Sequence, residues 1–508
     1  MDIPIVKTEI PSPLPQHASE PHLPVDGNYL HSLLNRFFDR ATEVERADLH
    51  AWTKYDLNEE FRVATGCSGT EGPLLVWHAF ATIANARFGI SVQVTSAFAS
   101  ENNPLKQDFI KALLPGPRPI FRDTSKLGEA TGEDVVSGDR LPIPVDAKFA
   151  AFGWPCTDVS SENMHSDSST NRSCVLDGTL STGSVFKGVV EYAKNHGAEL
   201  LVLHNENVPR LATLGKGCAI DNLSAACWLL SRECDMFTKV WQLDPRAFGV
   251  PVSRPRLHFP SFARKELRKI GLTDEKADKI LSDIMVRLVG SELAPVDAYL
   301  LDETDPVLHH FMYQHKEHDF TAEQLSAQSS LKWPRKHEST AARSGQSWFH
   351  QTYPSEETMR LYRGLRIMQV REIDLVMTKR VTQFPEAQQR FVDAGPSADR
   401  AAVVNTGSFP IVRPRSRTYI TDRCRTSIGF EHLRLQSICY PNPEKLLEFP
   451  DHLLVDLAGN AFELSCYAAS TFASCVMLSK GAAERNRHHL GDPDAESEDS
   501  GIEGIWGR

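Results

Sequence analysis

Residues 61–72 read FRVATGCSGTEG, a short apolar run followed by a turn of small residues, and a helix is predicted directly after them at 73–87. Three further apolar runs have the composition of buried strands: 91–98, 147–152 and 199–203. Further helix candidates lie at 104–113 and 184–196. Strands and helices that alternate at this spacing predict an α/β fold with a doubly wound, mostly parallel sheet covered on both faces.

The ends and the middle of the chain depart from this alternation. Residues 1–58 begin with a stretch rich in Pro, His and Glu, so we expect a disordered tail followed by a short helix; residues 484–508 are expected to form a disordered acidic tail. The alternation covers 59–260 and returns over 418–480. Residues 261–417 interrupt it, first with helices and then with irregular sequence. One main domain with a large insertion is therefore expected.

The charge of the chain argues against a surface uniformly adapted to polyanions, because the formal net charge is −11. One window differs: residues 331–380 carry ten Lys and Arg against five Asp and Glu. A local basic groove is compatible with this distribution. Trp333, Trp348 and Tyr362 in the same window suit stacking on bases, and they suit core or subunit contacts equally well.

Several other classes of protein are disfavoured. The ten cysteines include no Cys-x-x-Cys pair, so neither a disulfide framework nor a zinc site is indicated. No metal site is expected at the clustered His309, His310, His315 and His318, which lack carboxylate or cysteine support. No leader and no run of about 18 apolar residues is present, so we expect an intracellular protein with no membrane contact. Residues 6–13, VKTEIPSP, resemble a small-modifier attachment site followed by a proline-directed phosphorylation site, which favours the nucleus.

Polar or small residues follow three successive strands. The first is the turn of Gly66, Cys67, Ser68 and Gly69, where a ligand can approach the backbone and the following helix start favours a negative group. Glu101 follows the second strand, where a carboxylate can accept both hydroxyls of a ribose. Asp123 follows the third and could accept an adenine amino group. Alternatively, both carboxylates are helix caps.

Four further pieces occur in a fixed order: Gly153-Trp154-Pro155-Cys156, Glu206-Asn207-Val208, Pro251-x-x-Arg254-Pro255-Arg256 and Gly459-Asn460. Cys156 stands at a strand end and is a candidate nucleophile, whose thiol pKa would be lowered if a helix began beside it. Glu206 is a candidate acid. Together they indicate covalent chemistry on an electron-poor ring.

In these motifs and their order the chain resembles the cytosine carbon-5 methyltransferase family, over about 60–260 and again over about 418–475. The resemblance implies a sheet of the S-adenosylmethionine-dependent methyltransferase type, with 59–260 and 418–480 as the catalytic domain and 261–417 as an inserted target recognition region. It implies S-adenosylmethionine as cofactor, bound at the strand ends listed here: Gly66, Cys67, Ser68, Gly69, Glu101 and Asp123, with Asn460 closing the site.

The resemblance also implies roles in catalysis. Cys156 would add to carbon 6 of cytosine, and Glu206 would protonate or hydrogen-bond ring nitrogen 3. Asn207 would hold the loop, while Arg254 and Arg256 would orient the base or the catalytic loop. The target base would have to be flipped out of double-stranded DNA.

The chain departs from the family at four positions. Ala64 stands where Phe is usual, Ser68 where a second Gly is usual, Val252 where Gln is usual, and Thr157 follows the nucleophile where Gln is common. These changes put cofactor affinity and substrate in doubt more than the reaction.

Three functions follow as hypotheses. The first is methylation of DNA in the nucleus, with chromatin partners bound through the tails. The second is methylation of a structured RNA, although the Cys-Phe-Thr stretch of that branch is absent. The third is a non-catalytic chromatin regulator, against which the joint retention of Cys156, Glu206, Arg254 and Arg256 speaks.

Overall fold

The computed structural model describes residues 5–12, 28–57, 60–114, 119–160, 163, 167–215, 217–314, 389–393, 403–405, 408–414, 418–423 and 425–489. The basic window at 331–380 and residues 490–508 of the expected acidic tail lie outside these residues, as do His315 and His318. The expected start of that tail at 484 is wrong, because 484–489 belong to the helix Ala482–His489. His309 and His310 lie on α10 (Pro306–Gln314), where a ring nitrogen of His310 is 3.0 Å from the Leu447 carbonyl oxygen.

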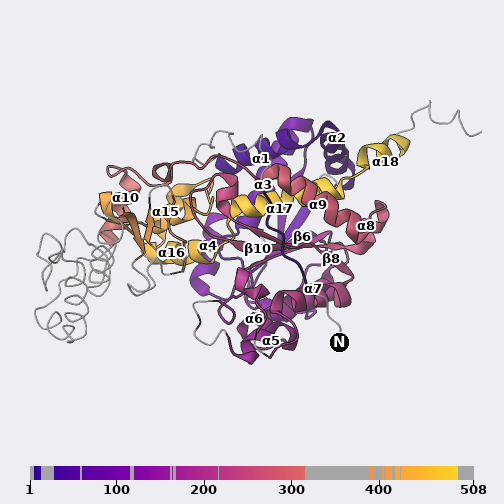
Figure 1. The fold of residues 1–508 in the computed structure, drawn as a ribbon, viewed down its shortest axis with the longest axis horizontal. Helices are drawn as coiled ribbons and strands as arrows, with labels where there is room; N and C mark the ends of the chain where they lie inside the picture. Colours follow the sequence, from indigo (N-terminus) through magenta and orange to yellow (C-terminus); the bar gives the residue numbers. More distant parts are fainter. Residues whose placement is uncertain are drawn as a thin grey trace, which may run out of the picture.

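The core of the fold is one large sheet (Figure 1) with strand order β3-β2-β1-β6-β7-β10-β8, and β9 pairs with β10. The strands are β1 (Glu60–Gly66), β2 (Gln93–Ser100), β3 (Ile120–Phe121), β6 (Ala147–Phe152), β7 (Val202–Asn207), β8 (Met236–Thr238), β9 (Trp241–Leu243) and β10 (Arg256–Ala263). The first five in spatial order are parallel, and β10 runs antiparallel to β7, β8 and β9. The predicted doubly wound, mostly parallel sheet is confirmed.

Helices cover both faces of this sheet because neighbouring strand residues face opposite sides. Phe149 and Ala151 of β6 join one apolar cluster, and Ala150 and Phe152 join the other. The first cluster holds α1 (Tyr29–Arg40), α3 (Gly72–Phe88), α9 (Asp274–Leu288) and α17 (Leu464–Leu478). The second holds α5 (Ser169–Asp177), α6 (Leu180–His196) and α7 (Asn222–Cys234). Figure 1 shows the two groups on opposite sides of the sheet.

The ends of these helices follow from local sequence. Pro73 starts α3 at a position where a missing backbone N–H costs nothing, and Gly89 ends it with a φ of 64°. Asn103 caps α4 (Pro104–Leu113) by accepting from the Leu105 N–H. A break between two helices follows in the same way: α8 (Arg264–Lys269) ends near Gly271, and Thr273 caps α9.

The described part also contains a second sheet, a hairpin and further helices. A second sheet has the order β12-β11-β13-β14, from β11 (Gln389–Asp393), β12 (Val403–Asn405), β13 (Thr418–Ile420) and β14 (Arg425–Thr426). A hairpin joins β4 (Thr131–Glu133) to β5 (Arg140–Pro142), and the remaining helices are α2 (Glu43–Ala51), α15 (Gly429–Arg434), α16 (Asp451–Asn460) and α18 (Ala482–His489). The stretch Asp451–Leu478 is long and apolar enough to cross a membrane by composition, but its apolar 18-residue window is buried within the protein.

The structure moves the expected domain boundaries. Residues 261–288 belong to the main body, since β10 continues to Ala263 and α9 packs on α17. The expected boundary at 418 falls inside the second sheet, which takes strands from both sides of it. The apolar face of α9 decides the first difference, because its burial against α17 outweighs the change of pattern in the sequence.

The first tail also differs from expectation. Residues 5–12 lie within the stretch for which composition predicts disorder, yet Glu9 forms a parallel bridge with Trp241 beside β9. The backbone bonds and the Glu9–Lys239 ion pair supply the ordering that apolar burial within the segment alone does not.

Candidate active site

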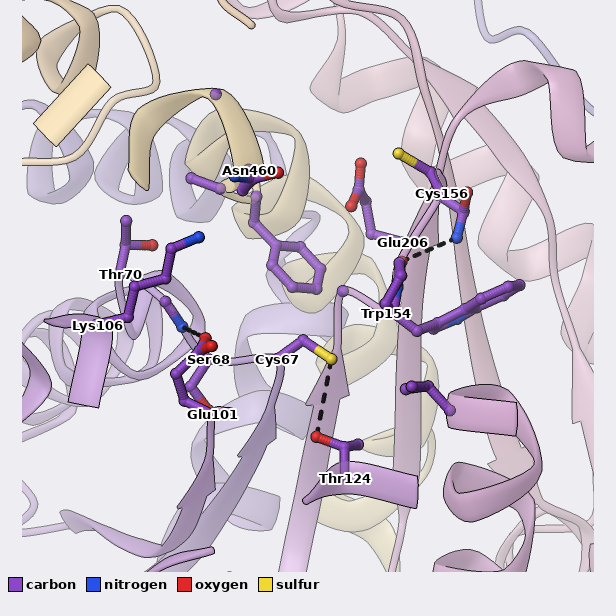
Figure 2. Close-up of a pocket in the computed structure, with 18 of the residues that line it drawn as sticks. Cys67, Ser68, Thr70, Glu101, Lys106, Thr124, Trp154, Cys156, Glu206 and Asn460 are labelled. Carbon is purple, nitrogen blue, oxygen red and sulfur yellow. Dashed lines mark hydrogen bonds between the residues drawn. The ribbon is translucent and has the colours of Figure 1, made fainter. Parts of the chain in front are cut away.

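A cavity of about 250 Å³ lies where the carboxyl ends of β1, β2, β6 and β7 meet. The strand order reverses between β1 and β6, and such a switch point is where doubly wound sheets bind ligands. Eleven of the twelve predicted site residues line the cavity: Cys67, Ser68, Gly69, Glu101, Asp123, Cys156, Glu206, Asn207, Arg254, Arg256 and Asn460. Figure 2 shows Cys156 and Glu206 at one end and Ser68, Glu101 and Lys106 at the other.

Gly66 is the one predicted residue that does not line the cavity, and its role is steric. A Cβ atom there would lie 2.1 Å from Cδ1 of the fully buried Phe152 on β6. The turn after it is tightly wound, with positive φ at Cys67 (52°), Gly69 (43°) and Glu71 (54°). Close approach of the turn to β6 therefore requires glycine at position 66.

Gly66→Ala is expected to destabilise the fold by about 1–3 kcal/mol, because the new methyl group overlaps the Phe152 ring. Urea unfolding followed by circular dichroism measures the change. Adding Phe152→Leu makes room for the methyl group, so the double variant should be more stable than additivity of the two single changes predicts. Additive losses would show that the two side chains do not compete for this space.

Ser68, where the family usually has glycine, binds the end of the neighbouring strand. Its Oγ accepts from the Ser100 N–H (3.1 Å), lies 3.2 Å from the Ser100 carbonyl oxygen and contacts the Thr65 hydroxyl (2.8 Å). The hydroxyl is thus engaged with β2. This departure from the family joins two strand ends.

The two predicted acceptor carboxylates are both held by backbone N–H groups. Glu101 accepts from Gly69 and Asn103, each at 3.0 Å, which joins the turn to the start of α4. Asp123 caps the short helix Thr124–Lys126 by accepting from the Ser125 N–H at 2.9 Å. The cap interpretation is therefore correct for Asp123, whereas Asn103 is the cap of α4. Both carboxylates still line the cavity.

Cys156 follows β6 and is partly buried. No helix begins beside it; the next in the described chain is α5, starting at Ser169. Burial raises the pKa of the Cys156 thiol, against the opposing charge of Arg256, while Glu206 raises it further. The condition for a helix-lowered pKa is therefore not met, and Arg256 is the group that favours the thiolate.

Glu206 ends β7 and faces Arg256, whose Nε lies 3.2 Å from Oε1. The two side chains are only 10% and 13% exposed, so this ion pair is largely shielded from water. Burial raises the pKa of Glu206, although Arg256 and Arg254 oppose the rise. A carboxyl with a raised pKa can carry a proton closer to neutral pH, as a general acid must.

Asn207 connects the two strand ends that carry Cys156 and Glu206. Its Nδ2 donates to the Trp154 carbonyl at 3.1 Å, and its Oδ1 accepts from the Val208 N–H at 2.8 Å. These contacts suit a residue that holds the Trp154-Pro155-Cys156 loop in place.

Arg254 binds backbone carbonyls, a function that its sequence motif does not indicate. Nη2 donates to the carbonyls of Gly459 (2.9 Å) and Ala461 (3.0 Å), and Nη1 donates to that of Val412. Burial and the nearby Arg256 lower its pKa to about 9, so the side chain is charged at neutral pH. Arg254 thus joins the residues just before β10 to two segments that are distant in the sequence.

Two features explain why these segments lie so close. A Cβ at Gly459 would lie 2.0 Å from the Pro414 nitrogen, so only glycine allows the approach. Val252, which replaces the usual Gln, is fully buried and bridges to Phe409. The end of the insertion, at Phe409 and Pro414, is therefore in direct contact with the wall of the cavity.

Arg254→Lys keeps the charge, but a single ammonium group cannot replace the planar guanidinium group that donates to three carbonyls. We expect a loss of about 1–3 kcal/mol in unfolding free energy, because buried carbonyls lose their donors, and a higher KM for cofactor. Urea unfolding and initial rates measure the two effects. Arg434→Lys is the control, since Arg434 also donates to a carbonyl, that of Ala298 at 2.8 Å, but does not line the cavity. If both variants lost the same stability and showed the same rise in KM for cofactor, Arg254 would have no specific link to the cofactor site.

Sequence reasoning missed several residues that line the cavity. Lys106 on α4 lines one side of the cavity and lies 2.8 Å from Asp456 on α16. Phe462 contributes an aromatic ring two positions after the Gly459-Asn460 motif, and its Cε2 would be 3.0 Å from a Cβ at Gly153. Both residues lie close in sequence to predicted motifs, and this proximity is the signal that could have identified them. Asn460 itself donates to the Asp456 carbonyl at 2.9 Å.

No protein-family model matches the chain. One curated relative, the DNA (cytosine-5-)-methyltransferase DMT5 of Cryptococcus neoformans var. grubii serotype A, is 25% identical over 464 residues. The match covers 83% of this chain and 17% of that protein, so the chain spans about a sixth of the relative's length.

Solved structures give weaker likenesses. A mutant of Spodoptera frugiperda DNMT2 aligns with a TM-score of 0.39 at 12% identity, over 82% of this chain and 99% of that one. The S. pombe Dnmt2 methyltransferase aligns with a TM-score of 0.38 at 11% identity, over 81% and 97%. The fold is therefore assigned from the sheet topology described above.

The strand order and the cavity at the switch point define a doubly wound α/β fold, the sheet type that the sequence motifs predict for an S-adenosylmethionine-dependent methyltransferase. Within that class, the ordered motifs and the match to DMT5 confirm the predicted resemblance to the cytosine carbon-5 methyltransferase family.

Proposed function

We propose that this chain is a DNA cytosine carbon-5 methyltransferase that uses S-adenosylmethionine. The observation that carries the proposal is the convergence of Cys156, Glu206 and Arg256 at one end of a cavity whose other end is formed by the glycine turn and Glu101. A nucleophile, an acid and a cationic partner thus share a wall with a nucleoside-type site.

The residues at the far end suit the cofactor. Each oxygen of Glu101 accepts one backbone N–H and keeps a lone pair, so the carboxylate can still accept ribose hydroxyls. The turn of small residues lets a ligand approach the backbone. When bound, S-adenosylmethionine supplies an electrophilic methyl group.

At the near end the chain's own residues activate the base. The Cys156 thiolate adds to carbon 6 of cytosine, while Glu206 gives a proton or a hydrogen bond to ring nitrogen 3. Electron density then reaches carbon 5, which becomes nucleophilic enough to take a methyl group. Loss of the carbon 5 proton to a base then breaks the Cys156–carbon 6 bond, releases the thiolate and restores the ring. Arg256 holds Glu206 and favours the thiolate, and Asn207 fixes the loop that carries Cys156.

DNA is the preferred substrate because the relative's name describes a DNA methyltransferase and because the insertion occupies the position of a target recognition region. The proposal extends to double-stranded DNA with a flipped base and to a nuclear location, with chromatin partners bound through the tails. Methylation of RNA is the alternative at the same site.

Transfer of labelled methyl groups from S-adenosylmethionine to duplex DNA tests the proposal, with transfer RNA in parallel and Cys156→Ala as the control. Incorporation into DNA that disappears in the variant supports it. Incorporation into RNA alone would change the substrate. If neither is labelled although the cofactor binds in calorimetry, a non-catalytic regulator becomes the better interpretation.

The pH dependence of kcat/KM should report the two raised pKa values. The reaction needs thiolate at Cys156 and a proton on Glu206, so the rate rises with pH up to the pKa of Glu206, which lies above its ordinary 4.5. It then stays level and falls above the pKa of Cys156, which lies above 9.0. Initial rates from pH 4 to about 10 measure the profile. A rise that continues to the thiol pKa would mean that Glu206 does not act as the acid.

A further inference from the structure

Residues 5–12 lie along the edge of the main sheet beside β9. The Glu9 N–H donates to the Val240 carbonyl (3.2 Å), and the Glu9 carbonyl accepts from the Gln242 N–H (2.8 Å). Nearer the start of the segment, the Val6 N–H donates to the Ser224 hydroxyl at 2.9 Å, and the Val6 side chain packs against the apolar cluster that includes α7. An extended segment therefore adds to a sheet edge, as bound peptides do.

The side chains of this segment divide into engaged and exposed ones. Glu9 pairs with Lys239 (2.5 Å) and accepts from the Ser282 hydroxyl (2.8 Å). Lys239 is almost fully buried and also contacts Asp278 at 2.9 Å. Lys7 and Ser12, by contrast, are exposed.

The spacing of these residues has a chemical meaning. VKTEIPSP places an aliphatic residue before a lysine, a glutamate two positions after it, and a Ser-Pro pair three positions after the glutamate. Enzymes that conjugate small ubiquitin-like modifiers recognise an extended aliphatic-Lys-x-Glu segment, and a phosphate just beyond it adds negative charge on the acidic side. Five of the eight positions satisfy this combined pattern, which makes it more specific than either half.

We propose that Lys7 is an attachment site for a small ubiquitin-like modifier, and that attachment competes with docking of residues 5–12 on the sheet edge. The Lys7 Nζ attacks the thioester carbonyl of the charged conjugating enzyme. A C–N bond forms, the C–S bond breaks, the enzyme leaves as a thiolate, and the amine loses a proton to solvent.

Competition follows from the contacts. The aliphatic residue and the glutamate that a conjugating enzyme must read are Val6 and Glu9, and both are engaged with the protein in the docked state. Of Val6, Lys7 and Glu9, Lys7 is the one that is exposed to solvent. The segment must therefore leave the sheet before the motif can be read, and Lys239 keeps Asp278 as a partner when it does.

Two variants, one on each side of the Glu9–Lys239 ion pair, test the proposal. The full chain is incubated with purified conjugating enzymes and modifier, and the product is quantified on gels and mapped by mass spectrometry. Lys239→Gln frees the segment and leaves the motif intact, so conjugation at Lys7 should rise by at least about fivefold, the factor that loss of a contact of roughly 1 kcal/mol gives. Glu9→Gln breaks the same pair but removes the residue that the enzyme reads, so conjugation should fall.

Three matched variants complete the experiment. Lys7→Arg should remove the product, and Ser12→Asp should give more than Ser12→Ala. Lys148→Gln loses a surface pair with Glu199 elsewhere on the sheet and should match the wild type. Thermal melts exclude unfolding in each variant.

Two outcomes would overturn the proposal. Modification that maps to other lysines and persists in Lys7→Arg would place the site elsewhere. Equal rises in Lys239→Gln and Glu9→Gln would show that release alone decides, without recognition of the motif. Neither outcome bears on methyl transfer, so this test is independent of the proposed activity.

Discussion

Replacing Cys156 by alanine is expected to lower the rate of methyl transfer by at least about 10³-fold, because the variant cannot form the bond to carbon 6 on which activation of carbon 5 depends. The loss should appear in kcat, with little change in the affinity for cofactor, since Cys156 stands at the end of the cavity away from Glu101. Single-turnover assays with labelled cofactor separate the two.

The same variant should lose covalent capture of DNA. A duplex with 5-fluorocytosine at the target position traps the adduct of an intact enzyme, which then migrates as a protein–DNA species on a denaturing gel. Cys234→Ala is the control, because that thiol is also partly buried but donates to the Val190 carbonyl outside the cavity. Wild-type trapping without Cys156 would disprove its assignment as the nucleophile.

Glu206→Gln should reduce kcat by about 10²- to 10⁴-fold, the usual contribution of a positioned proton donor. The amide has nearly the same shape, so the strand end and the cavity should persist, but it cannot deliver a proton to ring nitrogen 3. The pH profile should change as well, because the rate then follows the thiolate fraction alone and rises up to the pKa of Cys156.

A matched carboxylate serves as the control for this second variant. Glu199 lies just before β7, is largely exposed and pairs with Lys148 at 2.8 Å. Glu199→Gln should retain wild-type rates and an unchanged pH profile. If Glu206→Gln retained the level region of the profile between the two pKa values, another group would have to supply the proton.

Much of the site could be predicted because its parts are local in sequence. Glu101, Asp123, Cys156 and Glu206 each follow a short apolar run, and parallel strands bring their carboxyl ends to one edge of a sheet. The steric need for glycine at position 66 has the same origin, since β6 is the neighbour of β1.

The remaining features depend on partners that no local pattern identifies. The carbonyls that Arg254 binds lie 158, 205 and 207 residues further along the chain. Lys239 is 230 residues from Glu9, so composition alone indicated a disordered tail where the pair imposes order. A lowered thiol pKa depended on a helix start beside Cys156, and turns follow that residue instead.

The large sequence separation between Arg254 and its carbonyl partners also affects synthesis of the protein on the ribosome. Gly459 is made 205 residues after Arg254, which at about 5–20 residues per second takes roughly 10–40 s. Until then the emerging strand carries a cation without its carbonyl partners, and the wall of the cavity next to Cys156 and Glu206 is incomplete. Nascent chains should therefore depend on protection from aggregation during this interval, and the cavity wall should be complete only after Gly459 and Ala461 have been made.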